Sequence, residues 1–211
     1  MSDIANLQTY GARLNSAQVE EALSHVFMSN NELTKKNPDK RGTPVCLWGT
    51  HGIGKTQMVK SFAEDHDWPF AYCAPAQFEE MGDLHGIPET WDPTPEAPNS
   101  GDEVTVYRPP EWVPQIEPDP GKSGILLLDD FNRADIRILR GCMQLLQNFE
   151  MFSWALPPRW QIVCTANPEG GDYSVTPMDD AMLTRMLHMT MVFDAKSWAR
   201  WAVNAGVDGH V

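Results

Sequence analysis

A glycine-rich loop between an apolar run and a helical pattern constrains this chain more than any other feature. Residues 43–48 read Thr-Pro-Val-Cys-Leu-Trp, which is typical of a short buried parallel strand. Met58, Val59, Phe62 and Ala63 then repeat at helical spacing. The residues between these two elements fit the pattern of glycine, four residues, Gly-Lys-Ser/Thr that binds phosphate. They are Gly49, Thr50, His51, Gly52, Ile53, Gly54, Lys55 and Thr56.

The residue types of this loop match the chemistry of a triphosphate. Glycines permit backbone angles that turn successive amides toward an anion, and the N-terminus of the next helix adds a positive dipole. Lys55 can reach the β- and γ-phosphates, and Thr56 can offer its hydroxyl to Mg²⁺. His51 occupies a variable position of the pattern. The strand before and the helix after the loop argue against a plain glycine-rich turn. The sequence therefore predicts a site for ATP with Mg²⁺.

A second feature follows about seventy residues later, where an aliphatic run ends in two acids. Residues 125–128 are Ile-Leu-Leu-Leu, which predicts a buried strand, and Asp129 and Asp130 come directly after it. A carboxylate at this place can hold Mg²⁺ beside Thr56, so Asp129 is the predicted metal ligand. Asp130 is placed to orient or deprotonate an attacking water. The alternative for Asp130 is a helix-capping or solvated acid.

The rest of the chain alternates strand and helix patterns. Such alternation predicts an α/β fold, with a parallel sheet and helices on both faces. Five strands are expected, at residues 43–48, 70–74, 125–128, 160–166 and 187–193. A first helix is expected from 16 to about 30, others near 58–63 and 136–146, and a last one at 195–205. The expected division is an N-terminal helix and linker over 1–42, a nucleotide-binding core over 43–194, and a C-terminal helix within 195–211.

A proline-rich stretch interrupts this alternation. Residues 88–120 hold nine of the 17 prolines, and so many residues without an amide hydrogen exclude a helix. Asn99-Ser100-Gly101-Asp102 before Val104 could turn a small hairpin. A surface loop is the alternative.

Charge and hydropathy argue against several classes of function. The formal net charge is −13, from 16 basic and 29 acidic residues. Because nucleic-acid surfaces usually carry a basic excess or stripe, a DNA or RNA motor is disfavoured. No apolar run approaches the roughly 20 residues of a membrane helix, and the N-terminus does not resemble a signal peptide. Neither a membrane partner nor a nucleic acid is expected.

The cysteines favour a reducing compartment. Cys46, Cys73, Cys142 and Cys164 are widely separated and show no Cys-x-x-Cys spacing. We expect buried thiols in a cytoplasmic protein.

Several short motifs, in order, resemble those of MoxR-type AAA+ ATPases. Residues 129–134, Asp-Asp-Phe-Asn-Arg-Ala, resemble the family's Asp-Glu-Ile-Asn-Arg-Ala. Residues 83–86, Asp-Leu-His-Gly, resemble its Asp-Leu-x-Gly, and residues 165–168, Thr-Ala-Asn-Pro, resemble its Thr-x-Asn-Pro. Residues 179–186 resemble its Asp-x-Ala-Leu-Leu-Asp-Arg-Phe. The resemblance covers roughly residues 40–193 and implies a P-loop NTPase core of the AAA+ type.

The resemblance assigns roles to two further residues. Asn167 corresponds to the sensor that touches the γ-phosphate or the attacking water, and Arg185 to the finger that reaches a neighbouring subunit's nucleotide. The residues agree, since Asn167 ends a strand at the edge where ligands bind. Thr176 and Pro177 predict the N-cap and first residue of a short helix before Arg185. The alternatives are a turn residue for Asn167 and a surface ion pair for Arg185.

Three departures from the family separate two functional hypotheses. Asp130 stands where the family has Glu, the stretch from Phe149 to Arg159 is shorter than the family's hairpin, and no complete helical lid precedes Val211. The lid is either absent or lies beyond this sequence. The first hypothesis is an ATPase that assembles into a ring, such as a hexamer, and remodels a protein client, often alongside a von Willebrand factor A protein. The second is a scaffold or switch that binds ATP with little hydrolysis.

Overall fold

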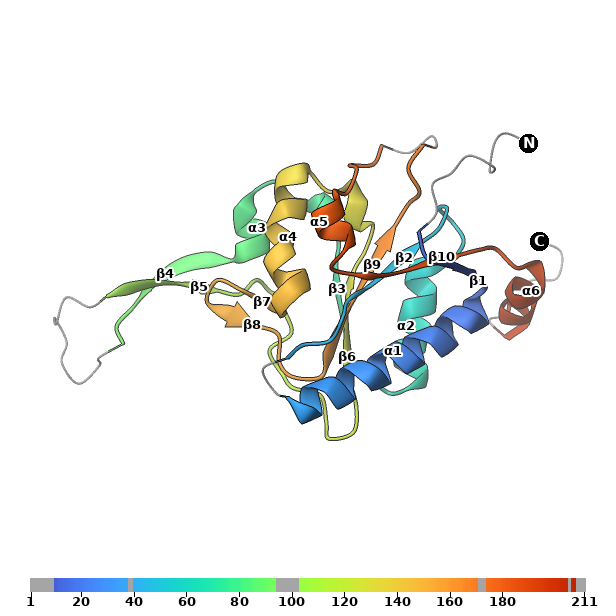
Figure 1. Cartoon of the computed structure of the whole chain (residues 1–211), viewed down its shortest axis with the longest axis horizontal. Helices are drawn as coiled ribbons and strands as arrows, with labels where there is room; N and C mark the ends of the chain where they lie inside the picture. Colours follow the sequence, from blue (N-terminus) through green and yellow to red (C-terminus); the bar gives the residue numbers. More distant parts are fainter. Residues whose placement is uncertain (1–9, 38–39, 94–102, 171–173, 205, 208–211) are drawn as a thin grey trace.

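A parallel sheet forms the centre of the molecule, and helices cover both of its faces (Figure 1). The computed structural model describes residues 10–37, 40–93, 103–170, 174–204 and 206–207. The strand order of the sheet is β1-β10-β2-β9-β6-β3. These strands are β1 (Ala12–Leu14), β2 (Val45–Trp48), β3 (Phe70–Cys73), β6 (Gly124–Leu128), β9 (Trp160–Ala166) and β10 (Leu187–Met191). The predicted α/β fold is confirmed.

The sheet has six strands rather than the five expected, because β1 adds an edge strand before the first helix. Its three residues pair in parallel with β10, from Ala12 opposite Met189 to Leu14 opposite Met191. Only Leu14 is partly buried, while Ala12 and Arg13 are exposed. A strand this short and this exposed carries no hydrophobic alternation, so its sequence pattern gave no signal.

Successive residues of the central strands face two different helical layers. Cys46, Leu126 and Cys164 pack with helix α4 (Ile136–Asn148), whereas Leu47 and Leu127 pack with helices α1 (Ser16–Lys36) and α2 (Lys55–Asp65). This period of two gives one hydrophobic core on each face of the sheet. The helices are α1 (Ser16–Lys36), α2 (Lys55–Asp65), α3 (Met81–His85), α4 (Ile136–Asn148), α5 (Asp180–Leu183) and α6 (Ala195–Asn204), with 3₁₀ turns η2 (Pro75–Gln77) and η3 (Phe131–Arg133).

Helix α1 begins where expected and ends one to two turns later than expected. Asn15 caps it in a reciprocal pair with Gln18. The apolar pattern fades at Asn30, which suggested an end there. Asn30 is nevertheless buried and contacts the sheet through its amide group, so tertiary contacts carry the helix on to Lys36.

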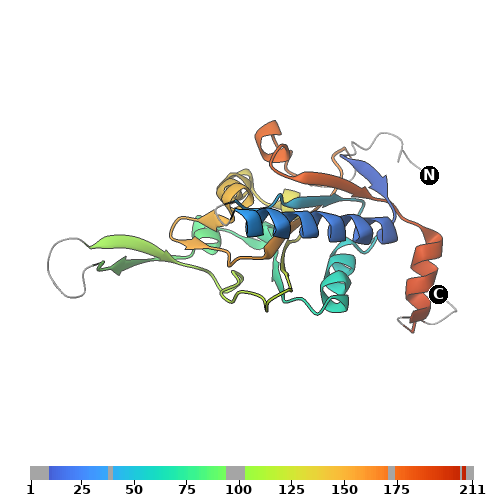
Figure 2. The ribbon, with the colours of Figure 1, turned by 60° about the horizontal axis from the view of Figure 1, so that its bottom comes forward.

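The proline-rich stretch contains a hairpin, as one of the two interpretations predicted. β4 (Ile87–Trp91) pairs antiparallel with β5 (Val104–Arg108). The predicted turn at residues 99–102 lies outside the described residues. Strands β7 (Glu150–Met151) and β8 (Trp154–Ala155) form a smaller hairpin within residues 149–159, before β9. The β4–β5 hairpin projects from one end of the molecule and α6 from the other (Figures 1 and 2).

Two further predictions from the sequence were buried cysteine thiols and no membrane-spanning helix. All four cysteines are free and buried, and burial raises the pKa of each thiol. Among the described helices, none combines the length and the hydropathy that a bilayer crossing requires.

Candidate active site

The predicted phosphate loop joins β2 to α2 at the carboxyl edge of the sheet. Gly52 has φ 73° and Gly54 has φ 87°, the left-handed region that side chains with a Cβ rarely adopt. Gly54 is the N-cap of α2, and Lys55 and Thr56 form the first turn of the helix. His51 is exposed in the loop. This geometry is that of a backbone cradle at a helix N-terminus.

Lys55 is the buried cation of the site, with only 7% of its surface exposed. Its Nζ donates to the carbonyl oxygens of Gly49 at 2.7 Å and Thr50 at 3.1 Å, and to Oδ1 of Asn167 at 3.1 Å. Burial lowers the pKa of this ammonium group, and the charges of Asp130 and Asp129 partly offset that effect. An anion bound in the loop would replace part of the protein acceptors and favour the charged amine.

Asp129 collects three hydroxyl groups from three different elements. Its Oδ1 accepts from Thr56 Oγ1 at 2.8 Å and from Thr165 Oγ1 at 2.6 Å. Its Oδ2 accepts from the hydroxyl of Tyr72 at 3.2 Å. The Tyr72 pKa is raised, first by burial and then by the Asp129 charge. The predicted pair of Thr56 and Asp129 is therefore in direct contact.

The donor set around Thr56 and Asp129 suits Mg²⁺ held partly by phosphate. A hydroxyl and a carboxylate oxygen are hard ligands, and Mg²⁺ is usually bound by one or two carboxylates together with water and substrate phosphates. Among the described residues, no three His, Cys, Asp or Glu side chains form a cluster able to hold a metal alone. The residues thus fit a metal that arrives with its nucleotide rather than an all-protein cage.

Asp130 lies next to this pair in a left-handed conformation, with φ 48° and ψ 40°. Its backbone N–H donates to Thr165 Oγ1 at 2.8 Å. Its Oδ1 accepts from Asn167 Nδ2 at 2.9 Å, and its Oδ2 faces Arg133 at 3.3 Å. The alternative of a purely solvated acid does not fit these contacts. Both carboxylate oxygens are engaged by donors, which fixes the orientation of the group.

Asn167 connects the loop to the acids. Its side chain accepts from Lys55 and donates to Asp130, and it is 3% exposed. The residue directly follows β9, which lies between β2 and β6, so it stands at the carboxyl edge of the sheet as the end of its apolar run predicted. Hydrogen bonds therefore join four of the residues predicted to act on nucleotide or water into one network with Thr56, through the hydroxyl of Thr165: Lys55, Asp129, Asp130 and Asn167.

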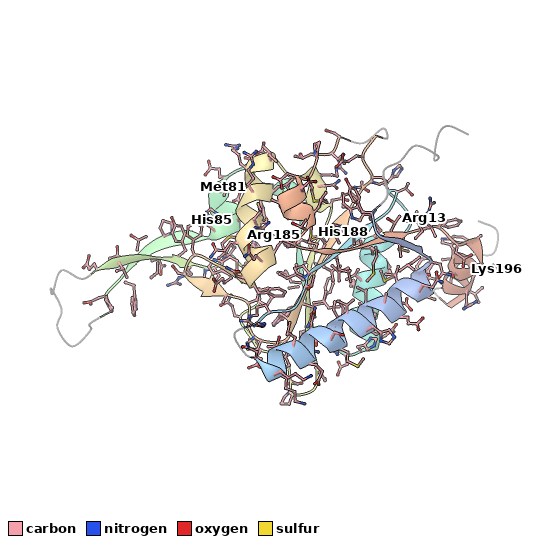
Figure 3. All side chains as sticks on the ribbon, in the orientation of Figure 1. Arg13, Met81, His85, Arg185, His188 and Lys196 are labelled. Atoms are coloured by element: carbon pink, nitrogen blue, oxygen red, sulfur yellow. The ribbon has the colours of Figure 1, made fainter. Side chains whose placement is uncertain are left out.

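Arg185 lies outside this network, next to helices α4 and α5 (Figure 3). Its Nε donates to Gln147 Oε1 at 3.0 Å, and its NH1 donates to the carbonyl of Ala181. These partners are neutral, so the alternative of a surface ion pair is not what the guanidinium forms here. Arg185 is partly exposed in this arrangement.

The short helix before Arg185 begins later than predicted. Asp179, not Thr176, is the N-cap of α5, and its side chain accepts from the amide of Met182. Thr176 instead donates its hydroxyl to the Ala134 carbonyl. The expectation was wrong because Thr and Asp are both good caps. The hydroxyl of Thr176 is used in the contact with the turn after β6, so Asp179 caps the helix instead.

Three residues of the site carry no role in the sequence interpretation. They are Tyr72, Asn132 and Thr165, which contact Asp129, Asn167 and both acids respectively. Thr165 and Asn132 stood within recognised motifs, two residues before Asn167 and two after Asp130. Tyr72 gave no signal, because an exposed aromatic on a strand has many ordinary uses.

A comparison with known families agrees with this geometry. Residues 44–186 match the AAA domain of the dynein-related subfamily. The chain belongs to this AAA family. The matched residues of this AAA domain include the loop, both acids, Asn167 and Arg185. Nucleotide binding is the shared property of such domains, and they typically assemble into oligomers.

One curated relative and two solved structures place the AAA domain among longer proteins. An ATP-dependent protease ATP-binding subunit-like protein of Rhodococcus erythropolis is 29% identical over 121 residues, covering 54% of this chain and 32% of the relative. A proposed ATPase from Cytophaga hutchinsonii aligns with TM-score 0.53 at 15% identity, over 92% of this chain and 58% of the other. A variant of Thermotoga maritima RuvB aligns with TM-score 0.53 at 14% identity, over 90% and 53%. At these identities the structures show the fold, and this chain spans less than two thirds of each.

Proposed function

We propose that this AAA domain hydrolyses ATP with Mg²⁺ and works in an oligomer as a MoxR-type remodelling ATPase. The observation that carries the proposal is the network that joins Lys55, Thr56, Asp129, Asp130 and Asn167 at one edge of the sheet. A phosphate-binding lysine, a metal-side hydroxyl and carboxylate, and a second acid held by an amide are the parts that phosphoryl transfer to water requires.

Each residue has a task in this reaction. The loop amides and Lys55 hold the β- and γ-phosphates, and Mg²⁺, held by Thr56 and Asp129, would neutralise charge on their oxygens. Asp130 orients a water molecule and accepts its proton. Asn167 holds the Asp130 carboxylate and lies beside Lys55, where the γ-phosphate would bind. The water oxygen bonds to the γ-phosphorus as the bond to the β–γ bridging oxygen breaks, which yields ADP and phosphate.

The proposal extends to a neighbouring subunit and a client. A guanidinium supplied by Arg185 of a second copy would offset charge on the transferring phosphoryl group. The motif resemblance to MoxR-type proteins supports a ring, with six subunits as one size, and a protein client, with a von Willebrand factor A protein as a frequent companion. The same resemblance, together with the buried free thiols, supports a cytoplasmic location.

ATP turnover measured across a protein titration tests this proposal. We expect Mg²⁺-dependent turnover that rises per subunit as the protein concentration rises, because Arg185 acts between copies. Lys55→Ala is the matched inactive control. Turnover that is absent at high concentration, or equal in Lys55→Ala, would reject hydrolysis.

A second function is favoured by the contacts of Asp130. Arg133 and Asn167 engage both oxygens of Asp130, whose side chain is shorter than the family's Glu, so the carboxylate is held away from a free choice of water position. The chain would then act as a switch or scaffold that binds ATP and hydrolyses it slowly. Asp130→Glu distinguishes the two, since a large gain in turnover indicates impaired chemistry in the native chain, and brisk native turnover removes the switch hypothesis.

A further inference from the structure

The buried side chain of Asn132 holds the backbone of Asn167 by two hydrogen bonds. Its Nδ2 donates to the Asn167 carbonyl at 2.8 Å, and its Oδ1 accepts from the Asn167 N–H at 3.0 Å. Asn132 is 0% exposed. The last residue pair between β6 and β9 is Leu128 with Cys164. The amide of Asn132 thus substitutes for a neighbouring strand beyond the end of that pairing.

This clamp determines where the Asn167 side chain lies. With its peptide groups held on both sides, Asn167 places its own amide between Lys55 Nζ at 3.1 Å and Asp130 Oδ1 at 2.9 Å. Among the hydrogen bonds of the described residues, those of Asn132 go to Asn167 and Thr176, and none reaches either charged group. Its influence on them therefore passes through Asn167.

The backbone of Asn132 binds a second segment. Its carbonyl accepts from the Thr176 N–H at 2.7 Å, and the Thr176 hydroxyl donates to Ala134 at 2.8 Å. Thr176 begins the segment that leads into α5 and to Arg185. The turn η3 therefore lies between the residues around the γ-phosphate position and the segment that carries the proposed inter-subunit arginine.

We infer that Asn132 is a positioning residue, which aligns Asn167 for ATP hydrolysis and ties that alignment to the segment before α5. The inference rests on the proposed function for its effect on turnover. Its physical basis is that a buried amide with both ends satisfied fixes geometry, whereas removal leaves the Asn167 peptide without its partners. Small displacements of groups that orient reacting atoms lower the rate far more than they lower substrate binding.

The chain provides a matched control at the opposite edge of the sheet. Asn30 makes the same two-bond clamp on Thr43, with Nδ2 to the carbonyl at 3.1 Å and the N–H to Oδ1 at 3.0 Å. It is also buried, at 7% exposed. Asn30→Ala removes this clamp and one further hydrogen bond, to Gln161 Oε1 at 2.9 Å. It therefore removes at least as many interactions as Asn132→Ala, and only Asn132 lies beside the proposed site.

The experiment compares these two variants in steady-state turnover, in ATP and ADP affinity, and in amide hydrogen exchange. For Asn132→Ala we expect kcat to fall about tenfold or more while KM changes less than about threefold. Exchange of the Asn167 amide should accelerate. For Asn30→Ala we expect kcat to stay within about twofold of the native value while the Thr43 amide exchanges faster. Asn132→Asp, which keeps the shape and the acceptor but loses the donor, should also lower kcat and serves if the alanine variant does not fold.

The outcomes separate this inference from the proposed function. Equal kcat in Asn132→Ala and Asn30→Ala, or unchanged protection of the Asn167 amide in the Asn132 variants, overturns it. If the native chain binds ATP without turnover, the proposed hydrolysis is rejected. The nucleotide affinities and the amide exchange of Asn167 then test the positioning role of Asn132. Loss of both Asn167 protection and the preference for ATP over ADP, confined to the Asn132 variants, then supports the positioning role. Retention of either contradicts it.

Discussion

The two edges of the same parallel sheet use buried polar groups in opposite ways. At the amino edge, Asn30 donates to Gln161, Gln161 donates to Asn31, and Asn31 donates to Ser123, at 2.9, 3.0 and 2.8 Å. These neutral groups satisfy one another and fasten α1 to the starts of β9 and β6. The carboxyl edge instead gathers Lys55, Asp129, Asp130 and Arg133 among its amides and hydroxyls.

The difference lies in charge rather than in burial. This chain of amides gains little from a ligand, because each of its side chains already has a hydrogen-bond partner. A buried ammonium among carbonyls and an amide has much to gain from an anion, since charge-assisted hydrogen bonds are about twice as strong as neutral ones. We therefore infer that the polar groups of the amino edge stabilise the fold, whereas those of the carboxyl edge bind the nucleotide and react with it. Substitutions at each edge test this division.

The largest effect is expected from Asp130→Asn. The substitution keeps the shape and removes the base, so turnover should fall by about 10²- to 10⁴-fold. ATP affinity should change little, because Asp130 is not placed to bind phosphate. Single-turnover assays together with calorimetry measure the two quantities. Turnover equal to that of the native chain would mean that another group activates the water.

Lys55→Ala should have the next largest effect, on ATP binding. Loss of a charge-assisted hydrogen bond of about 1.5–3 kcal/mol corresponds to roughly 10- to 100-fold weaker affinity. Titration calorimetry with ATP and Mg²⁺ measures it directly. Lys60→Ala is a suitable control, because Lys60 lies exposed on the same helix in an ion pair with Glu64. Unchanged affinity in Lys55→Ala would remove the phosphate site from this loop.

The same comparison explains what the sequence could and could not predict. The loop, Asp129 and Asn167 were predictable because strand ends at one edge must converge, and their motifs are local in the sequence. The clamp from Asn132, the hydroxyl of Tyr72 and the amino-edge chain of Asn30 and Gln161 depend on side chains far apart in sequence. Hydrophobic periodicity contains no information on which polar residues meet, and it also missed the short, exposed strand β1.

At the amino edge, Gln161→Leu should lower stability without changing ATP affinity or turnover. Gln161 is 3% exposed and connects Asn30 to Asn31. Its loss leaves the buried amide of Asn30 and the half-buried amide of Asn31 each short of a partner, which costs about 1–3 kcal/mol of unfolding free energy. Urea unfolding measures the change, with Gln57→Leu on the exposed surface of α2 as the control. A fall in turnover of the folded variant under native conditions would show that the two edges are coupled.

The smallest effect separates the edges by pH. Burial lowers the pKa of Lys55, while the amides and hydroxyl of the amino edge do not titrate in this range. Only the charged amine attracts phosphate, so ATP affinity should fall as pH rises through the lowered pKa, before an exposed lysine would lose its proton. In that window the unfolded chain binds more protons than the folded one, so the stability of the nucleotide-free protein should rise with pH.

ATP binding should be accompanied by proton uptake, measured by calorimetry in buffers of different ionisation enthalpy. Lys55→Arg keeps a charge that does not titrate and should abolish the uptake. Uptake that persists in that variant would assign the proton to another group at the carboxyl edge.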